Sequence, residues 1–324
     1  MKILFVGDGH SNAGPANVNK RLMDNLTEQY RILKARNLLT KTAELFWKML
    51  TSDVLVVSGI TRIGMAALKL SQLLRVKSVY IMHGCAEYEA KVNGCEPNSE
   101  LLIRGEREIL KSVDLILPVS VKFSDWLKKR YPEYACKMEY LFNGIDRLPK
   151  NKFDDSKREN RIVSVGADRA TKNNSVLSEA VEGLGGYAHL IVCGKVHFQS
   201  AIPHRLHTQY LGLVPQEEFY QELCKSKLFV LNSLFEPFSL SVIDALNCGC
   251  SILVSNCAGI VDLLELHDSD IVFDPTDKDE IRAKIQYILK NPNNRRIASH
   301  LNYDSVSYKK RVEELTSYCE RLLG

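Results

Sequence analysis

Long apolar runs are missing from this chain of 324 residues. A helix needs about 20 mostly apolar residues to span a bilayer, and no uncharged apolar stretch of the chain approaches that length. The first apolar run, Ile3–Val6, is short and leads into Gly7-Asp8-Gly9, without the apolar segment and cleavage site of a secretion signal. We therefore expect a cytoplasmic protein without a membrane-spanning helix.

Regularly spaced cysteine pairs are also missing, although the chain has nine cysteines. An odd total with scattered spacing is typical of reduced thiols rather than of disulfides. Cys248 and Cys250 stand one residue apart, but no histidine has the spacing of a metal-binding partner. We interpret both as small buried residues. We expect neither a metal nor a cofactor.

The first half of the chain is poor in acidic residues. Residues 1–150 contain 23 Lys and Arg against 16 Asp and Glu, whereas residues 151–324 contain 20 against 23. This asymmetry predicts an anionic partner for the first half, although not a nucleic acid. Residues 33–50 combine Trp47 and several other apolar residues with basic ones. We favour a core helix with a solvated basic edge; the alternative is a helix that lies on an anionic membrane.

Strand and helix patterns alternate along the chain, which is typical of α/β folds with doubly wound parallel sheets. In the first half we expect strands at residues 3–6, 31–35, 54–58, 78–82, 115–119 and 137–142. A polar segment at 149–160 is interpreted as a linker. Beyond it we expect strands at residues 162–165, 189–193, 209–211, 228–231, 251–254 and 271–273. The predicted domains are 1–148 and 161–303, followed by a helical segment at 304–324.

The most informative stretch runs from residue 228 to residue 258. A buried strand leads through a turn into a helix that we expect to begin near Pro237, since proline tolerates a first helical turn. Glu236 stands at the entrance of this helix, and Asp244 lies about 12 Å further along its axis. The free N–H groups of residues 238–240 would form an anion site beside Glu236. This arrangement suits an extended ligand with a phosphate in its middle and hydroxyl groups at both ends.

The segment Glu236-Pro237-Phe238-Ser239-Leu240, followed by three residues and Asp244, resembles a family signature. It is similar to the Glu-Pro-Phe-Gly-Leu-x3-Glu motif of family 4 retaining glycosyltransferases. These enzymes have the GT-B fold, are also called glycosyl transferases group 1, and include a bacterial polysaccharide type that this chain resembles. Ser239 and Asp244 depart from the usual Gly and Glu. The resemblance implies two Rossmann-like domains that face a cleft, the first for the acceptor and the second for the nucleotide sugar. Segment 304–324 would then cross back to the first domain.

The resemblance also implies roles for residues of the second domain. Glu236 would bind hydroxyl groups of the donor sugar, and Asp244 would bind those of the ribose. Lys172 matches the lysine that neutralises the diphosphate as it leaves. The arginine that usually precedes that lysine is replaced by Ala167, so Arg169, two residues later, is the candidate substitute.

Further site residues follow other expected strands. His83, directly after strand 78–82, corresponds to a histidine that touches the donor sugar in the family. The loop at 7–17 is rich in glycine but lacks G-x-G-x-x-G, which argues against a nicotinamide cofactor. The remaining donor-binding candidates are Gly14, Gly194, Lys195, Val214, Phe238, Ser239 and Leu240. Ser120 and Asn143 are landmarks of the fold and weaker candidates.

The predicted activity is a retaining transfer of sugar from a nucleotide-sugar donor to a carbohydrate or lipid-linked saccharide acceptor, in surface polysaccharide synthesis. We expect no metal, because cations and a helix N-terminus already neutralise the diphosphate. Asp268-Ser269-Asp270 resembles an Asp-x-Asp metal motif, but we interpret it as a solvated turn. Two alternatives remain open: a nucleotide-sugar epimerase of GT-B fold, and a catalytically silent binding subunit, which Ala167 and Ser239 favour.

Overall fold

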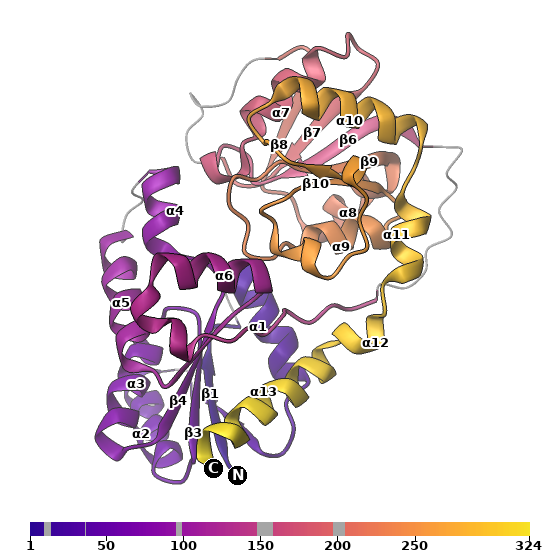
Figure 1. Ribbon diagram of the computed structural model, residues 1–324. Coiled ribbons are helices and arrows are strands. Elements are labelled where there is room, and N and C mark those ends of the chain that lie inside the picture. The colour runs from indigo at the N-terminus through magenta and orange to yellow at the C-terminus, as the bar shows by residue number, and fades with distance from the viewer. Residues whose placement is uncertain (10–13, 36, 95–98, 148–157, 197–204) are drawn as a thin grey trace. The chain divides into compact units, whose positions relative to one another are not determined.

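The computed structural model describes residues 1–9, 14–35, 37–94, 99–147, 158–196 and 205–324. The chain divides into two compact units, shown in Figure 1. Unit 1 comprises Met1–Asp146 together with Tyr303–Gly324, and unit 2 comprises Arg147–Asn302. The C-terminal segment is therefore part of the unit that contains the N-terminus.

Unit 1 contains a sheet of five parallel strands in the order β2-β1-β3-β4-β5. The central strands β1, β3 and β4 are almost entirely buried, because helices cover both faces of a parallel sheet. The strands are β1 (Ile3–Gly7), β2 (Tyr30–Ile32), β3 (Val54–Ser58), β4 (Lys77–Met82) and β5 (Leu115–Pro118).

Four helices of unit 1 begin at polar caps. Asn37, Thr61, Ser120 and Ser307 each precede a helix and accept a hydrogen bond from a backbone N–H of its first turn. The helices are α1 (Gly14–Asp24), α2 (Leu38–Met49), α3 (Arg62–Leu74), α4 (Ala86–Asn93), α5 (Ser99–Ser112), α6 (Val121–Arg130), η1 (Pro132–Lys137), α12 (Tyr303–Val306) and α13 (Tyr308–Leu323).

The C-terminal helix α13 is tied to the rest of unit 1 by close packing. A Cβ atom on Gly144 would lie 2.4 Å from the ring of Tyr308, so only glycine fits there. The next residue, Ile145, donates its backbone N–H to the carbonyl of Val306 at 2.9 Å. Gly144 therefore has a structural role, which explains why the segment Asn143-Gly144 is a landmark of the fold.

Unit 2 contains six parallel strands in the order β11-β10-β9-β6-β7-β8. The strands are β6 (Glu159–Val165), β7 (His189–Cys193), β8 (Thr208–Gly212), β9 (Ser226–Leu231), β10 (Ser251–Ser255) and β11 (Ile271–Val272). The helices are η3 (Ala170–Lys172), α7 (Asn174–Glu182), α8 (Gln216–Lys225), α9 (Leu240–Asn247), η5 (Gly259–Asp262), η6 (Asp268–Asp270), α10 (Lys278–Lys290) and α11 (Asn294–His300).

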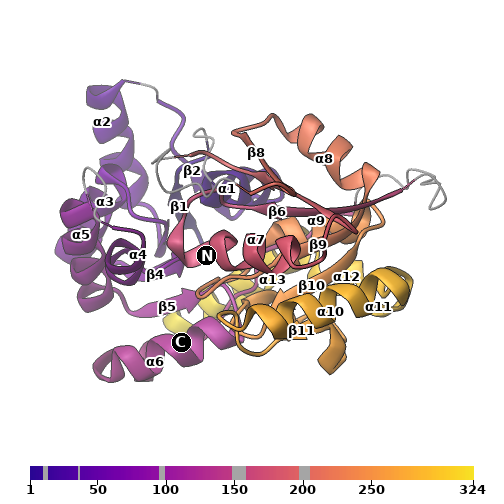
Figure 2. The same cartoon turned by 90° about the horizontal axis from the view of Figure 1, so that it is seen from above.

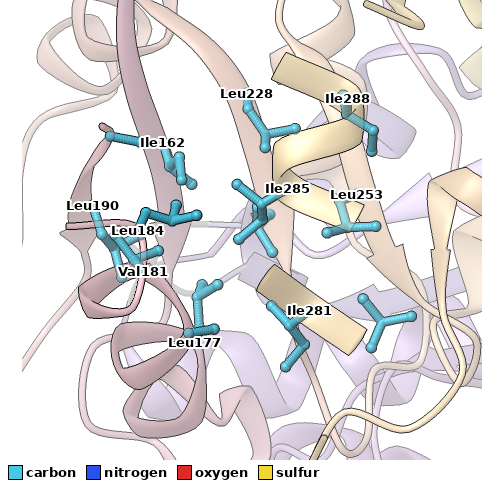
Figure 3. Close-up of a cluster of buried hydrophobic side chains, with 14 of the residues drawn as sticks. Ile162, Leu177, Val181, Leu184, Leu190, Leu228, Leu253, Ile281, Ile285 and Ile288 are labelled. Atoms are coloured by element: carbon cyan, nitrogen blue, oxygen red, sulfur yellow. The ribbon is translucent and has the colours of Figure 1, made fainter. Parts of the chain in front are cut away.

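Helices α7 and α10 cover one face of the unit 2 sheet (Figure 3). Ile281, Ile285 and Ile288 recur at helical spacing along α10 and point at the apolar side chains of the strands. All three are at most 1% exposed. This core fixes the sheet whose strand ends carry the candidate site.

Four expectations about local structure need correction. The segment 137–142 is not a strand; Met138 forms only an isolated bridge with Ile116, because η1 occupies the preceding residues. The segment that follows β4, in which we expect a long polar loop at residues 84–98, instead contains helix α4. Helix α9 begins at Leu240, three residues after Pro237. The expected linker lies mostly outside the described residues, and its last two residues belong to β6.

Candidate functional site

Two charged side chains meet at the carboxyl end of the unit 2 sheet. Lys172 ends η3, which follows β6, and Glu236 lies in the loop that follows β9. The Nζ atom of Lys172 donates a hydrogen bond to Oε2 of Glu236, and the two side chains are only 18% and 10% exposed. The pair forms because β6 and β9 are neighbours in the sheet, so that the loops at their carboxyl ends lie together.

Glycines allow the loops after β6 and β7 to approach each other closely. Gly166 has φ +95°, and a Cβ atom there would lie 2.3 Å from Cγ of Lys172. Gly194 has φ +137°, and its Cβ atom would lie 3.0 Å from the backbone nitrogen of Gly166. The Gly166 N–H also donates to the carbonyl of Cys193 at 2.8 Å. Gly194 therefore supports the loop that carries Lys172.

The backbone on either side of Glu236 is fixed by a second chain segment. Glu236 forms a parallel bridge with Ala258. The N–H groups of Gly259 and Ile260 donate to the carbonyls of Glu236 and Phe238 at 2.9 and 3.0 Å. Phe238 is buried at 2% exposure, so its side chain anchors this loop in the core.

Asparagines that the sequence did not single out hold these loops in place. Asn173 and Asn232 both donate to the carbonyl of Pro275, at 2.6 and 3.0 Å. The buried Asn174 donates to the carbonyls of Val165 and Ala167, both at 3.0 Å. Their spacing matches no motif that would have revealed them, because each asparagine acts on backbone that is distant in sequence or belongs to an irregular loop.

The N-terminus of α9 follows Glu236. Ser239 is the residue before the helix, has φ +83° and makes no side-chain cap; its hydroxyl instead lies 2.9 Å from that of Ser241. The first N–H groups of α9, starting at Leu240, have no acceptor within the helix and carry its partial positive charge. The helix N-terminus at which we expect an anion site therefore begins at Leu240 rather than at Phe238.

Asp244 lies on α9, and its Oδ1 atom accepts a hydrogen bond from the Tyr220 hydroxyl at 3.3 Å. Gln216 donates to the same hydroxyl at 2.5 Å. Tyr220 and Gln216 come from α8, which the sequence did not connect with the motif. A hydrogen bond from the neighbouring helix α8 thus positions the half-buried side chain of Asp244.

The other candidates of unit 2 are less enclosed. Arg169 is exposed, and its guanidinium has no partner within the described residues. Lys195 is exposed as well, and Val214 is half-buried. The structure thus brings Lys172 to Glu236 and leaves Arg169 in solvent.

The strand ends of unit 1 carry a chain of uncharged groups. His83 follows β4, and its Nε2 atom lies 2.8 Å from the Ser58 hydroxyl. Ser58 donates to Oδ1 of Asn19 at 2.5 Å, and Asn19 donates to the carbonyl of Asp8 at 3.0 Å. Because the single hydroxyl proton of Ser58 goes to Asn19, Nε2 of His83 is the donor. The Nδ1 atom is buried without a hydrogen-bond partner among the described residues, which favours a neutral ring. Burial supports this state, since it lowers the pKa of His83 to about 4.

A buried carboxyl group lies near the hydrogen-bonded groups that follow β4. Glu106 on α5 is 1% exposed and accepts hydrogen bonds from the N–H groups of Ala86 at 3.0 Å and Glu87 at 3.5 Å. Burial raises the pKa of Glu106 to about 7. Glu106 therefore caps α4, the helix that begins just after His83.

The remaining unit 1 candidates are structural or lie at the edge of the described residues. Ser120 is buried and caps α6 by accepting from the N–H of Phe123 at 3.1 Å. Gly14 begins α1 and is exposed, and a Cβ atom there would meet nothing within 4 Å. The adjoining part of its loop, residues 10–13, lies outside the described residues.

The Asp-x-Asp segment is not the solvated turn that the sequence predicted. Asp270 is 1% exposed, accepts from Asn293 at 2.7 Å and pairs with Arg296. Its role is to join η6 to α11. Among the described residues no cluster of His, Cys, Asp and Glu is arranged to hold a metal, and their cysteines, including the buried Cys248 and Cys250, are free. None of the helices in these residues is long and apolar enough to cross a membrane.

Residues 147–303, which include all of this unit 2 site, match the family described as glycosyl transferases group 1. This match covers just under half of the chain. A stretch of 91 residues is 33% identical to the O-antigen chain mannosyltransferase B of Escherichia coli, covering 28% of this chain and 23% of that protein. A longer stretch of 151 residues is 26% identical to a Campylobacter jejuni enzyme, N-acetylgalactosamine-N,N'-diacetylbacillosaminyl-diphospho-undecaprenol 4-alpha-N-acetylgalactosaminyltransferase. This match covers 44% of this chain and 41% of that enzyme. The matches thus span less than half the length of both relatives.

The similarity of fold to solved structures extends over the whole chain. Anabaena HepE in complex with UDP and glucose superposes with a TM-score of 0.71 at 12% identity, covering 98% of this chain and 99% of that one. The catalytic domain of starch synthase IV from Arabidopsis thaliana, bound to ADP and acarbose, gives 0.72 at 10% identity, covering 100% and 99%. The two parallel sheets are those of the GT-B fold.

Proposed function

We propose that this protein is a retaining glycosyltransferase that moves a sugar from a nucleotide-sugar donor to a carbohydrate or lipid-linked saccharide acceptor in surface polysaccharide synthesis. The ion pair of Lys172 and Glu236 carries this proposal, because it places a cation and a carboxylate at the strand ends of the segment that matches the family. The named relatives support the acceptor class: one is an O-antigen mannosyltransferase, and the name of the other contains diphospho-undecaprenol.

The pair suggests how a donor would be bound. Without a ligand, each charge neutralises the other in a position that is mostly buried. Sugar hydroxyl groups that donate to Glu236 would replace Lys172 as its partner and release the ammonium group to the diphosphate. Lys172 and the first N–H groups of α9 would then stabilise the negative charge that grows as the bond between the sugar and the diphosphate breaks. The released cation makes a metal unnecessary in this scheme.

The other residues have assisting roles in the proposal. Asp244, supported by Tyr220, would bind the ribose hydroxyls, through a water where its shorter side chain falls short. The neutral His83 would contact the donor sugar through a hydrogen bond rather than through charge. Arg169 would reach the diphosphate from solvent, and the loops at Gly194, Lys195 and Val214 would hold the base. The acceptor would belong to unit 1, and the reaction to the cytoplasmic face of a membrane.

A silent binding subunit is the second candidate, because one usual phosphate-binding cation is absent. Ala167 occupies that position, is 2% exposed and has φ +42°, so this position presents no charge to a ligand. The only candidate replacement, Arg169, is exposed. A donor would still bind such a protein, but no sugar would be transferred.

Nucleotide binding and turnover separate these candidates. We expect one of UDP-, GDP-, ADP- or CMP-sugars to raise the melting temperature, since a ligand at 100 times its dissociation constant adds about 2.7 kcal/mol. With a saccharide acceptor, the wild type should release free nucleotide. Glu236→Gln should reduce this release about a thousandfold, whereas Glu218→Gln, which alters an exposed carboxylate of unit 2, should not. Binding without release would support the silent subunit, and no binding to any nucleotide would contradict both.

A further inference from the structure

Helix α2 is apolar on two sides. Leu45 and Met49 are buried at 3% and 0% exposure and pack into unit 1. The opposite side exposes Leu39 (83%), Phe46 (46%), Trp47 (69%) and Leu50 (46%). Together with the exposed Ala43, these residues lie within about 100° of the helix circumference. We call this stripe the α2 face. The sequence predicted a core helix with a solvated basic edge. One side of α2 does pack into the core, but the exposed side is apolar rather than basic.

Exposed cations lie on the helix that packs against α2. Helix α3 packs against α2, and the two lie side by side in Figures 1 and 2. Helix α3 contains no acidic residue, and Arg62, Lys69 and its cap Arg75 are all exposed. The only acid of α2, Glu44, is bonded to Lys48 and to the backbone at residues 34 and 35. In the described residues no carboxylate pairs with Lys41 or with these α3 cations.

We propose that the α2 face binds the surface of an anionic membrane. Tryptophan favours the interface between water and lipid, and neighbouring leucine and phenylalanine side chains enter the acyl boundary while cations contact the headgroups. Each Lys or Arg near an anionic surface adds about 1 kcal/mol of attraction. The exposed cations of α3 give the neighbourhood of α2 the charge that such a surface attracts.

A second copy of the chain fits the α2 face less well. Two copies that meet through the same patch contact each other reciprocally, which would bring the same arginines and lysines together. A stable protein interface also takes about 20–30 residues from each side, whereas the α2 face has five. An anionic lipid surface both neutralises the cations and accepts a small apolar patch.

This inference rests on the proposed function for its purpose, because a lipid-linked acceptor lies in a membrane. The binding itself is testable without any sugar transfer. The chain has two tryptophans, so Trp126→Phe leaves Trp47 as the only indole reporter. We expect the emission of Trp47 to shift to the blue with vesicles of phosphatidylcholine and phosphatidylglycerol, and not with phosphatidylcholine alone. The wild type should sediment with the anionic vesicles, and salt should weaken this binding.

Matched variants assign the binding to the α2 face. Leu39→Ser should reduce sedimentation at least fivefold, whereas Leu206→Ser, which changes an equally exposed leucine of unit 2 (86%), should leave it unchanged. Lys41→Ala and Lys69→Ala should each weaken binding roughly fivefold. Equal losses in the Leu39 and Leu206 variants, or no binding by the wild type, would overturn the proposal. A dimer that Leu39→Ser dissociates, without vesicle binding, would instead identify the face as a contact between copies and overturn it as well.

The outcome is independent of catalysis. Lys172→Ala should bind vesicles as the wild type does, because unit 2 does not contribute to the α2 face. Vesicle binding by a protein that transfers no sugar would leave this inference intact and refute the proposed function. Transfer to a soluble acceptor without vesicle binding would support the proposed function and refute this inference.

Discussion

The two units share one construction but satisfy the polar groups at their strand ends in different ways. In unit 2 a cation and a carboxylate, Lys172 and Glu236, neutralise each other in a mostly buried position. In unit 1 the neutral His83, Ser58 and Asn19 form a hydrogen-bonded chain, and the nearby carboxyl of Glu106 is half protonated near pH 7. The ion pair of unit 2 therefore has charge that a ligand can redistribute, whereas the chain from His83 to Asn19 in unit 1 offers hydrogen bonds without charge.

This difference agrees with the division of labour that we propose. A nucleotide diphosphate carries charge that must be stabilised as it leaves, and a paired lysine supplies this once its carboxylate finds another partner. A saccharide is uncharged and rich in hydroxyl groups, which neutral donors and acceptors suit. The following predictions test how far the contrast holds.

The largest effect should come from breaking the ion pair. Lys172→Met and Glu236→Gln should each lower the free energy of unfolding by about 2–4 kcal/mol, because the remaining partner is left without a counterion in a mostly buried position. The double variant should regain most of that loss, since no unpaired charge remains. All three should lose sugar transfer by about a hundredfold or more. Urea unfolding and nucleotide release measure the two effects.

Unit 1 supplies the control for this experiment. Ser58→Ala should cost about 1–2 kcal/mol, less than the loss of a charged partner, because it removes two uncharged hydrogen bonds to the buried groups of His83 and Asn19. A loss as large as that of the ion-pair variants would remove the contrast between the units. Recovery of transfer in the double variant would show that the pair serves stability alone.

The second-largest effect should come from replacing Gly194, the glycine that follows β7. Gly194→Ala combines an unfavourable φ with a contact of 3.0 Å to backbone, so we expect a loss of about 3 kcal/mol. Gly212→Ala is the matched control, because its φ is +74° but a Cβ atom there meets nothing within 4 Å, and it should cost about 1 kcal/mol. Thermal unfolding measures both. Equal losses would mean that the close approach of the two loops is unimportant.

A pH-dependent effect should follow in unit 1. Burial raises the pKa of Glu106 from 4.5 to about 7, so between these values the native state keeps a proton that the unfolded state releases. Stability should therefore fall as pH rises from about 4.5 to 7, by up to about 3 kcal/mol, and then level off. Glu106→Gln should remove this slope.

Urea unfolding of the wild type and Glu106→Gln at pH 5 and pH 8 tests this prediction. The lowered pKa of His83, about 4, has the opposite effect, because stability falls as pH drops below 6.5. Both proteins retain His83, so the difference between them isolates Glu106. Identical pH dependence in the two proteins would show that Glu106 is ionised throughout this range.

The smallest effect should be at Tyr220. Its hydrogen bond to Asp244 is 3.3 Å long, so Tyr220→Phe should weaken nucleotide binding only about two- to fivefold, or roughly 0.5–1 kcal/mol. Asp244→Asn should weaken it more, if the carboxylate binds the ribose. Calorimetric titration with the nucleotide that binds would measure both. Tyr187→Phe, a change at an exposed tyrosine of unit 2, serves as control and should have no effect.

Most of the fold was predictable from sequence, because buried parallel strands appear as short apolar runs. Ten of the expected strand positions coincide with strands of the two sheets, from β1 at Ile3–Gly7 to β11 at Ile271–Val272. The stretch at 31–35 overlaps β2 by two residues, and that at 137–142 is no strand, since an isolated bridge does not make a ladder. The motif around Glu236 likewise predicted the GT-B fold and the family that residues 147–303 match.

The sequence by itself determined which residues are chemically special: Glu236 and Asp244 by their motif, Lys172 by its place in a strand-end loop, and Trp47 among basic residues. Only the tertiary structure decided which of them meet. Lys172 pairs with Glu236 because β6 lies beside β9, an order that local patterns do not encode. The sequence equally did not reveal the second apolar side of α2 or the burial of Glu106. Exposure depends on which elements pack against a helix in the folded protein, and the helical period of the sequence does not specify those elements.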